Sequence, residues 1–125
     1  MVVILTDGSD KLEEISNFLS THGLEFRIVP IKEFKEGLKG NVEFVIYDTY
    51  NFTYKDVENI KITKEFNIPV LLITAYPEQW AIETISKLWR YDFIKDYLVK
   101  PVDIKKLAAY FPTCKTGGDA ETIRI

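Results

Sequence analysis

Five short apolar runs, separated by segments with helical spacing of apolar residues, predict an α/β protein built on a five-stranded parallel sheet. The runs cover residues 2–5, 26–29, 42–48, 70–74 and 97–99. Strands that are buried on both faces are continuous apolar stretches rather than alternating ones. Alternating strands and helices favour right-handed crossovers, which place helices on both faces of the sheet. We therefore predict a doubly wound sheet in one domain.

The central strand is predicted at residues 42–48, where the run VEFVIYD ends on the carboxylate of Asp48. In open parallel sheets, ligands and chemistry lie beyond the carboxyl ends of the strands. Asp48 is therefore a candidate functional residue. The alternative is that Asp48 caps a helix or starts a turn, since aspartate favours both positions.

The helices are predicted from apolar residues repeated every three or four positions. The first covers about residues 11–22, with Ser9 or Asp10 as its N-cap and Gly23 as its left-handed C-cap. A short second helix is predicted around residues 31–38. A third helix is predicted over about 54–66, with Thr53 and Asp56 as a capping pair. A fourth is predicted after Pro77, with the apolar stripe Ile82, Ile85, Leu88 and Trp89. Asp103 is predicted to cap a last short helix.

Composition limits the class of protein. The chain has 125 residues, 46% of them hydrophobic and 28% charged, with a net charge of −3. This balance is typical of a globular domain and does not favour nucleic-acid binding. The single cysteine, Cys114, cannot form an internal disulfide, and we see neither a basic leader nor a membrane-spanning stretch. We expect a soluble cytoplasmic protein with no nucleic-acid or membrane partner.

Polar residues follow four of the predicted strands and should meet at one edge of the sheet. These residues are Asp7, Asp48, Thr74 and Lys100. Such a cluster is costly to bury unless it is paired or binds a cation, and carboxylates suit Mg²⁺. The pattern predicts that the Asp48 carboxylate attacks a phosphoryl donor to give an acyl phosphate, while Lys100 and Thr74 hold the phosphoryl oxygens.

Three motifs resemble response regulator receiver domains over roughly residues 2–111. They are VEFVIYD ending at Asp48, VLLITA ending at Thr74 and Ala75, and DYLVKP, which contains Tyr97, Lys100 and Pro101. The resemblance implies a flavodoxin-like receiver fold with strand order 2-1-3-4-5. It also implies phosphorylation of Asp48 by a histidine kinase or phosphotransfer protein.

Further residue roles follow from this resemblance alone. It implies that Asp7, Asp48 and the backbone carbonyl of Tyr50 bind Mg²⁺. Tyr97 would be an aromatic switch that moves with Thr74, and the Lys100-Pro101 bond would be cis. The alternatives from the residues themselves are that Asp7 caps a helix, Thr74 is an ordinary strand residue and Tyr97 belongs to the core.

The chain departs from the receiver pattern after its first strand, where the family has two adjacent acids. Here Asp7 is flanked by Thr6 and Gly8. Counting back from Gly23 puts Thr6 in the first acidic place and Asp7 in the second, the metal-binding one. A one-residue shift in the alignment with the receiver pattern would instead put Gly8 at the metal-binding position. With one carboxylate fewer, we expect weak Mg²⁺ binding.

Two main functions remain open. The first is a single-domain receiver in a phosphorelay, which acts through a downstream protein partner and is no enzyme beyond catalysing its own phosphorylation. The second is a pseudo-receiver, a protein-interaction module that works without phosphorylation. A third, a flavodoxin-like ligand binder, is disfavoured because no glycine-rich phosphate loop is present.

Aromatic residues on the predicted fourth helix and fifth strand predict a surface for self-association as a homodimer or for partner binding. We expect Trp80 and Tyr91 to be its exposed rings. The alternative is that Phe93 and Ile94 in this segment only cover the sheet. Residues 112–125 are predicted to lie outside the 1–111 domain, as a flexible tail or an added edge strand.

Overall fold

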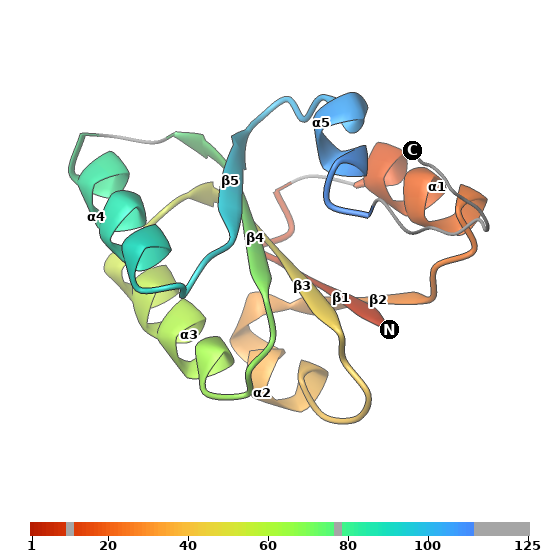
Figure 1. Ribbon diagram of the computed structural model, residues 1–125, viewed down its shortest axis with the longest axis horizontal. Coiled ribbons are helices and arrows are strands. Elements are labelled where there is room, and N and C mark those ends of the chain that lie inside the picture. Colours follow the sequence, from red (N-terminus) through yellow and green to blue (C-terminus); the bar gives the residue numbers. More distant parts are fainter. Residues whose placement is uncertain (10–11, 77–78, 112–125) are drawn as a thin grey trace.

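The computed structural model describes residues 1–9, 12–76 and 79–111, and all structural statements below concern these residues. Five parallel strands form one sheet with the order β2-β1-β3-β4-β5 (Figure 1). The predicted fold class and strand order are both confirmed. The strands are β1 (Val2–Thr6), β2 (Phe26–Pro30), β3 (Phe44–Asn51), β4 (Val70–Tyr76) and β5 (Asp96–Val99).

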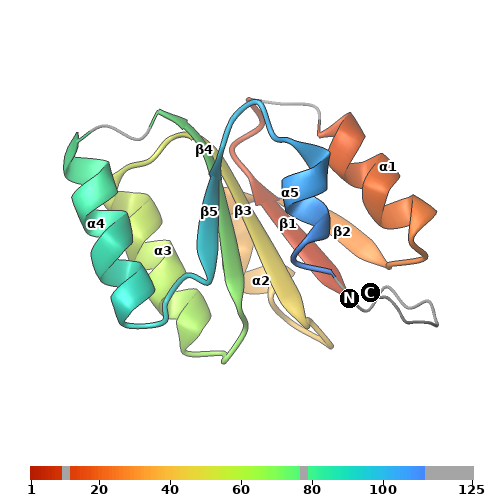
Figure 2. The ribbon, with the colours of Figure 1, turned by 45° about the horizontal axis from the view of Figure 1, so that its top comes forward.

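Helices cover both faces of the sheet. In Figure 2, α1 and α5 lie on one side of the strands, and α3 and α4 lie on the other. A short helical connection after β2 packs on the α3 and α4 side. The helices are α1 (Glu13–Thr21), the 3-10 turn η1 (Ile31–Glu33), α2 (Phe34–Gly37), α3 (Tyr54–Lys64), α4 (Gln79–Arg90) and α5 (Ile104–Ala108).

The sheet separates two hydrophobic cores. Alternate residues of each strand point to opposite faces, so neighbours in the sequence enter different cores. On β3, Tyr47 packs with α2, α3 and α4, whereas Ile46 packs with α1 and α5. Both side chains are fully buried. This alternation also decides which polar residues of the strand ends share a face.

The predicted end of the central strand at Asp48 is wrong, because β3 begins at Phe44 and continues to Asn51. The register pairs Thr49 with Thr74 and Asn51 with Tyr76, so the strand keeps a partner beyond Asp48. Asp48 itself lies between Thr6 of β1 and Ile73 of β4. It is therefore a buried residue inside a central strand, level with the last residue of β1.

The start of the first helix also differs from the prediction. Its N-cap is Leu12, with a positive φ of 61°, and Ser9 instead hydrogen-bonds to Asp7. The predicted C-cap is confirmed, since Gly23 has φ 70° and follows the C-cap residue His22. The amide of Leu24 donates to the carbonyl of Leu19 at 2.9 Å, which completes a Schellman motif.

The capping predictions for the later helices are confirmed. Thr53 and Asp56 form a reciprocal capping box at the start of α3. The Asp103 carboxylate accepts a hydrogen bond of 2.9 Å from the amide of Lys105 at the start of α5. Because both caps satisfy amides that have no partner within the helix, they fix where these helices begin.

The predicted apolar stripe of α4 is partly wrong. Ala81, Ile85 and Leu88 are buried, but Ile82 and Trp89 are exposed to solvent. The contacts with the sheet run along the 81, 85 and 88 positions, and these leave Ile82 and Trp89 on the outer side of the helix. The predictions for Asp10, Pro77, Cys114 and the tail 112–125 lie outside the described residues.

Candidate functional site

Asp48 is placed by β3 at the carboxyl end of the sheet, on the face covered by α1 and α5. Its side chain has no exposed surface. Thr6 pairs with Asp48 in the β1–β3 register and points to the same face. Lys100 reaches this face from the residue after β5, where its amide donates to the carbonyl of Thr74 at 3.0 Å. The Lys100-Pro101 bond is cis, as the receiver resemblance implies.

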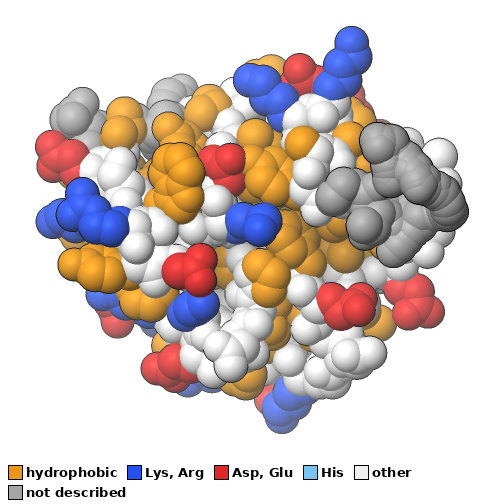
Figure 3. Space-filling model, viewed as in Figure 1, with side chains coloured by type: hydrophobic (Ala, Val, Ile, Leu, Met, Phe, Trp, Pro, Cys, Tyr) orange, Lys and Arg blue, Asp and Glu red, His pale blue; other side chains and the backbone are white. Residues whose placement is uncertain are grey.

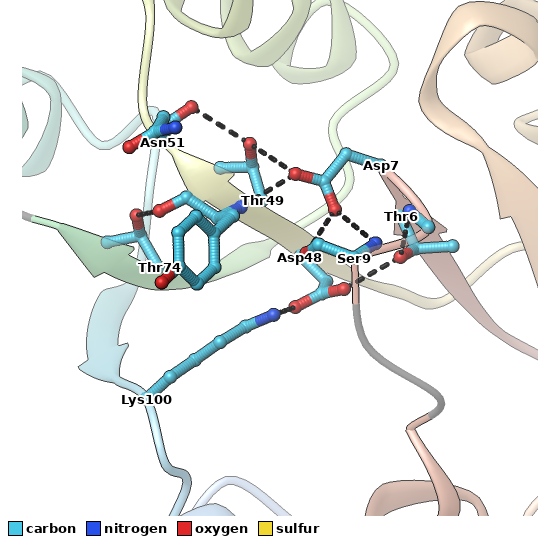
Figure 4. Close-up of polar contacts among 10 residues, drawn as sticks. Thr6, Asp7, Ser9, Asp48, Thr49, Asn51, Thr74 and Lys100 are labelled. Atoms are coloured by element: carbon cyan, nitrogen blue, oxygen red, sulfur yellow. Dashed lines mark hydrogen bonds and ion pairs between the residues drawn. The ribbon is translucent and has the colours of Figure 1, made fainter.

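Each carboxylate oxygen of Asp48 has a partner in the chain: Oδ1 forms an ion pair and Oδ2 accepts a hydrogen bond (Figure 4). The Lys100 ammonium lies 2.6 Å from Oδ1, and the Lys100 side chain is only 9% exposed. The Thr6 hydroxyl donates to Oδ2 at 2.7 Å. A buried carboxylate is expensive unless its charge is paired and its oxygens are bonded, and this site meets both conditions.

Asp7 lies beside this pair but bonds to a different set of groups. Its Oδ1 accepts from the amide and the hydroxyl of Ser9, at 2.9 and 2.6 Å. Its Oδ2 accepts from the amide of Tyr50 at 2.7 Å and from the Thr49 hydroxyl at 3.3 Å. Asp7 therefore joins the loop after β1 to the end of β3.

The two carboxyl groups have pKa values shifted in opposite directions. Burial raises the pKa of Asp48, although hydrogen bonds from Lys100 and Thr6 oppose the shift. Burial acts the same way on Asp7, but hydrogen bonds from Ser9 and Tyr50 outweigh it and lower the pKa of Asp7. Two neighbouring carboxyl groups with separated pKa values are typical of functional sites.

Thr74 and Tyr97 are arranged differently from the other predicted residues. The Thr74 hydroxyl donates to the backbone carbonyl of Tyr50 at 3.1 Å rather than to Asp48. Tyr97 is half-buried against the core of α2, α3 and α4. Thr49 and Ser9 are site residues that were not predicted, and no contact was predicted for Thr6. The strand register is the signal that identifies Thr6, since it pairs with Asp48.

The predicted metal ligands are Asp7, Asp48 and the carbonyl of Tyr50. All three supply oxygen, the donor that Mg²⁺ prefers, and each oxygen has room for more than one hydrogen bond or metal contact. The described part of the chain has no cluster of three or more His, Cys, Asp or Glu side chains suited to a metal. Two carboxylates and one carbonyl are nevertheless the oxygen donors that suit Mg²⁺, so the donor chemistry fits this ion with two charged ligands.

The aromatic rings predicted for the partner surface differ in exposure. Tyr91 is exposed, as expected, but Trp80 is only partly so. The ring of Tyr54 stacks on Trp80, with centroids 4.8 Å apart, and Phe52 lies behind it. Trp80 therefore joins the starts of α3 and α4, and Trp89 is the more exposed of the two tryptophans.

The α/β architecture and the site at the strand ends define a flavodoxin-like receiver fold. No family model matches the sequence, and no curated protein does either. Solved structures do match. One is the receiver domain of a sensor histidine kinase from Pseudomonas aeruginosa with Mg²⁺ coordinated in its active-site cleft, at TM-score 0.64 and 17% identity over 87% of this chain and 91% of that one.

Two further structures agree with this comparison. A receiver domain protein from Methanospirillum hungatei has a TM-score of 0.67 and 15% identity, with 88% of both chains covered. The receiver domain of an HD domain-containing protein from Pseudomonas fluorescens has a TM-score of 0.66 and 20% identity, covering 88% of this chain and 90% of that one. The resemblance to receiver domains is confirmed at the level of the fold.

Proposed function

We propose that this chain is a phosphorelay receiver that accepts a phosphoryl group on Asp48 and acts through a partner protein. The observation that carries the proposal is the ion pair of 2.6 Å between Lys100 and Asp48 at the carboxyl end of the sheet. Asp7 lies beside the pair, and the Thr74 hydroxyl lies at the end of the neighbouring strand. The donor would be an acyl phosphate or a phosphohistidine of a kinase or phosphotransfer protein.

The chemistry is one displacement at phosphorus. An Asp48 oxygen forms the new P–O bond, and the bond from phosphorus to the donor oxygen or nitrogen breaks with its electron pair. Asp7, Asp48 and the Tyr50 carbonyl would hold Mg²⁺, which would neutralise charge on the phosphoryl oxygens. The Lys100 ammonium, which lies beside Asp48 before the reaction, would donate to an oxygen of the phosphoryl group after it. Since Asp48 is fully buried, the groups that cover it would have to move before a donor could reach it.

The test is phosphorylation by a small acyl-phosphate donor in the presence of Mg²⁺, followed by intact-mass measurement. We expect one phosphoryl addition, abolished in Asp48→Asn. Asp103→Asn is the matched control, because Asp103 is exposed at the start of α5 and asparagine also caps helices. Unchanged mass in the parent protein at saturating donor would contradict the proposal.

A second function, the pseudo-receiver, is favoured by one specific observation. Thr6 stands where receiver domains carry an acid, and its hydroxyl donates to Oδ2 of Asp48 at 2.7 Å. A protein of this kind would bind its partner without phosphorylation. The phosphoryl mimic beryllofluoride, added with Mg²⁺, distinguishes the receiver from the pseudo-receiver. Only a receiver that binds beryllofluoride should show changed amide chemical shifts around Asp48.

Other parts of the proposal follow from the receiver function. Mg²⁺ would be a weakly bound cofactor, and catalysis would be limited to transfer onto Asp48. The protein would work in the cytoplasm, without nucleic-acid or membrane partners. No helix among the described residues is long and apolar enough to cross a bilayer. Self-association would use α4 and β5, with Tyr91 and the partly exposed Trp80.

A further inference from the structure

The face of α3 that packs against the sheet carries polar side chains as well as apolar ones. Asp56, Asn59 and Thr63 are buried there together with Val57 and Ile60. The opposite side of the helix carries exposed charges, and in Figure 3 acidic and basic side chains lie over α3 at the lower left of the view. Polar groups that a helix buries are costly unless they are hydrogen-bonded, so each of these side chains needs a partner.

The Asp56 carboxylate has its partners at two different places in the chain. Its Oδ1 accepts a hydrogen bond of 2.5 Å from the Tyr47 hydroxyl on β3. Its Oδ2 accepts from the amide and the hydroxyl of Thr53, at 2.8 and 2.9 Å. The Asn59 amide group donates to the Tyr47 oxygen at 3.0 Å, so the hydrogen of this hydroxyl is directed at Asp56. One carboxylate therefore joins β3 to the N-cap of α3.

The segment 48–52 lies between the two residues that this carboxylate joins. The segment carries Asp48 and also Tyr50, whose carbonyl is a predicted ligand of Mg²⁺. The Tyr50 amide donates to Asp7 at 2.7 Å, and the Tyr50 carbonyl accepts from the Thr74 hydroxyl at 3.1 Å. A short segment that is fixed at both ends has few conformations, so the bonds at its ends also restrict the direction of this carbonyl.

Three uncharged donor groups hold the Asp56 carboxylate. Asp56 is only 6% exposed, and no lysine, arginine or histidine of the described residues forms an ion pair with it. This differs from Asp48, whose charge is paired with Lys100. A buried carboxylate without a cation depends on its hydrogen bonds, so loss of the Tyr47 hydroxyl would free this carboxylate from β3.

We propose that Tyr47, Asp56 and Asn59 form a clamp that positions the Mg²⁺ site. The clamp fixes the ends of the segment 48–52 and therefore the direction of the Tyr50 carbonyl. The inference rests on the proposed function, in which this carbonyl helps to hold the ion. The Tyr47 side chain points to the opposite face of the sheet from the phosphoacceptor, so these positioning residues act through the main chain of β3. A ligand that is held in place before the metal binds raises the affinity of its site.

The test compares two clamp variants with a matched control. Tyr47→Phe removes the hydroxyl that joins β3 to Asp56, and Asp56→Asn replaces one of the two acceptor oxygens with a donor. Thr63→Val is the control, because it removes another buried hydroxyl of α3, whose hydrogen bond of 2.9 Å goes to the Asn59 carbonyl within the helix. For each protein, we would measure hydrogen exchange of the Tyr50 amide, Mg²⁺ affinity by NMR titration and global stability by urea unfolding.

After correction for global unfolding, we expect the Tyr50 amide to exchange about tenfold faster in both clamp variants than in the control. The Mg²⁺ affinity should fall about tenfold in Tyr47→Phe and Asp56→Asn and stay at the parent value in Thr63→Val.

Equal affinities in the parent, the clamp variants and the control would overturn the clamp and leave the proposed function standing. Faster exchange without a loss of affinity would also overturn it, because the network would then only hold α3 in place. A parent protein without Mg²⁺ affinity would contradict the proposed function itself, and the inference would fall with it.

Discussion

The Thr6 hydroxyl donates to Oδ2 of Asp48 at 2.7 Å, and its oxygen accepts from the amide of Gly8 at 3.0 Å. A hydroxyl has one hydrogen, so the bond from Gly8 leaves the Thr6 hydrogen for Asp48. Thr6 is therefore a donor of fixed direction toward the charged carboxylate. It holds Asp48 from the side opposite Lys100, which takes Oδ1.

Replacing Thr6 should shift the pH dependence of phosphorylation. Only the deprotonated Asp48 can attack, and burial raises its pKa, so the initial rate should rise as the pH rises through that value. Thr6→Val removes a donor to the charged form, which raises the pKa further and moves the profile to higher pH. Thr6→Ser keeps the donor and should follow the parent profile. Coinciding profiles for the valine and serine variants would show that the hydroxyl does not matter.

Thr6→Asp should tighten Mg²⁺ binding by about tenfold or more, because it adds a carboxylate beside Asp7 and Asp48. Isothermal titration of Mg²⁺ into both proteins measures the change. Thr6→Asn is the control, since it has similar size and no charge. An unchanged affinity in Thr6→Asp would mean that the metal place is at Gly8 and not at Asp7.

Lys100→Met should destabilise the fold by roughly 3–5 kcal/mol at neutral pH, because it leaves the negative charge of Asp48 buried without a cation beside it. Loss of the cation also raises the pKa of Asp48. A raised pKa in the folded state means that stability is lost as the pH rises through that pKa, so the deficit of the variant should shrink in acid. Urea unfolding at several pH values measures this.

Two further variants complete the Lys100 experiment. Asp48→Asn combined with Lys100→Met should recover part of the lost free energy of unfolding, because neither charge remains buried. Lys35→Met, at an exposed position in α2, is the matched control and should change stability little. A double variant no more stable than Lys100→Met would mean that the lysine acts through its packing.

Tyr47→Phe should cost about 1–3 kcal/mol of the free energy of unfolding. The buried Tyr47 hydroxyl donates to Asp56 at 2.5 Å and accepts from Asn59 at 3.0 Å, so its removal leaves two buried groups short of a partner. Tyr54 lies at the start of α3, the helix that carries Asp56 and Asn59, but its ring is exposed, so Tyr54→Phe should leave the free energy of unfolding nearly unchanged. Chemical denaturation of both variants makes the comparison, and equal effects would contradict the role of the buried network.

The sequence predicted the sheet because its central strands are buried on both faces. The run from Val70 to Thr74 is short and carries no charged side chain, which is typical of a strand buried on both faces. It also predicted the helix ends that depend on local chemistry, such as Gly23 and the capping box of Thr53 and Asp56. These features depend on a few neighbouring residues, and therefore local patterns are enough.

Contacts between distant segments could not be predicted in the same way. The contacts that hold the two carboxylates are examples: Asp7 accepts from the amide of Tyr50, and Asp48 pairs with Lys100, and neither contact was predicted as such. Whether Ile82 or Ala81 of α4 faces the sheet depends on how the whole helix is rotated, which one apolar stripe does not decide. Burial of Trp80 depends on Tyr54, a residue on another helix.

Because the sheet separates two cores, a structural change at Asp48 can reach the opposite core only by certain paths. Asp48 points toward α1 and α5, whereas its neighbour Tyr47 is tied to α3 through Asp56. Side chains on opposite faces of a sheet do not contact one another. A structural change at Asp48 would therefore reach the other face through the main chain of β3 or around the end of this strand, where the Thr74 hydroxyl donates to the carbonyl of Tyr50. The main chain of β3 is therefore the shortest covalent connection between Asp48 and the side of the sheet covered by α3.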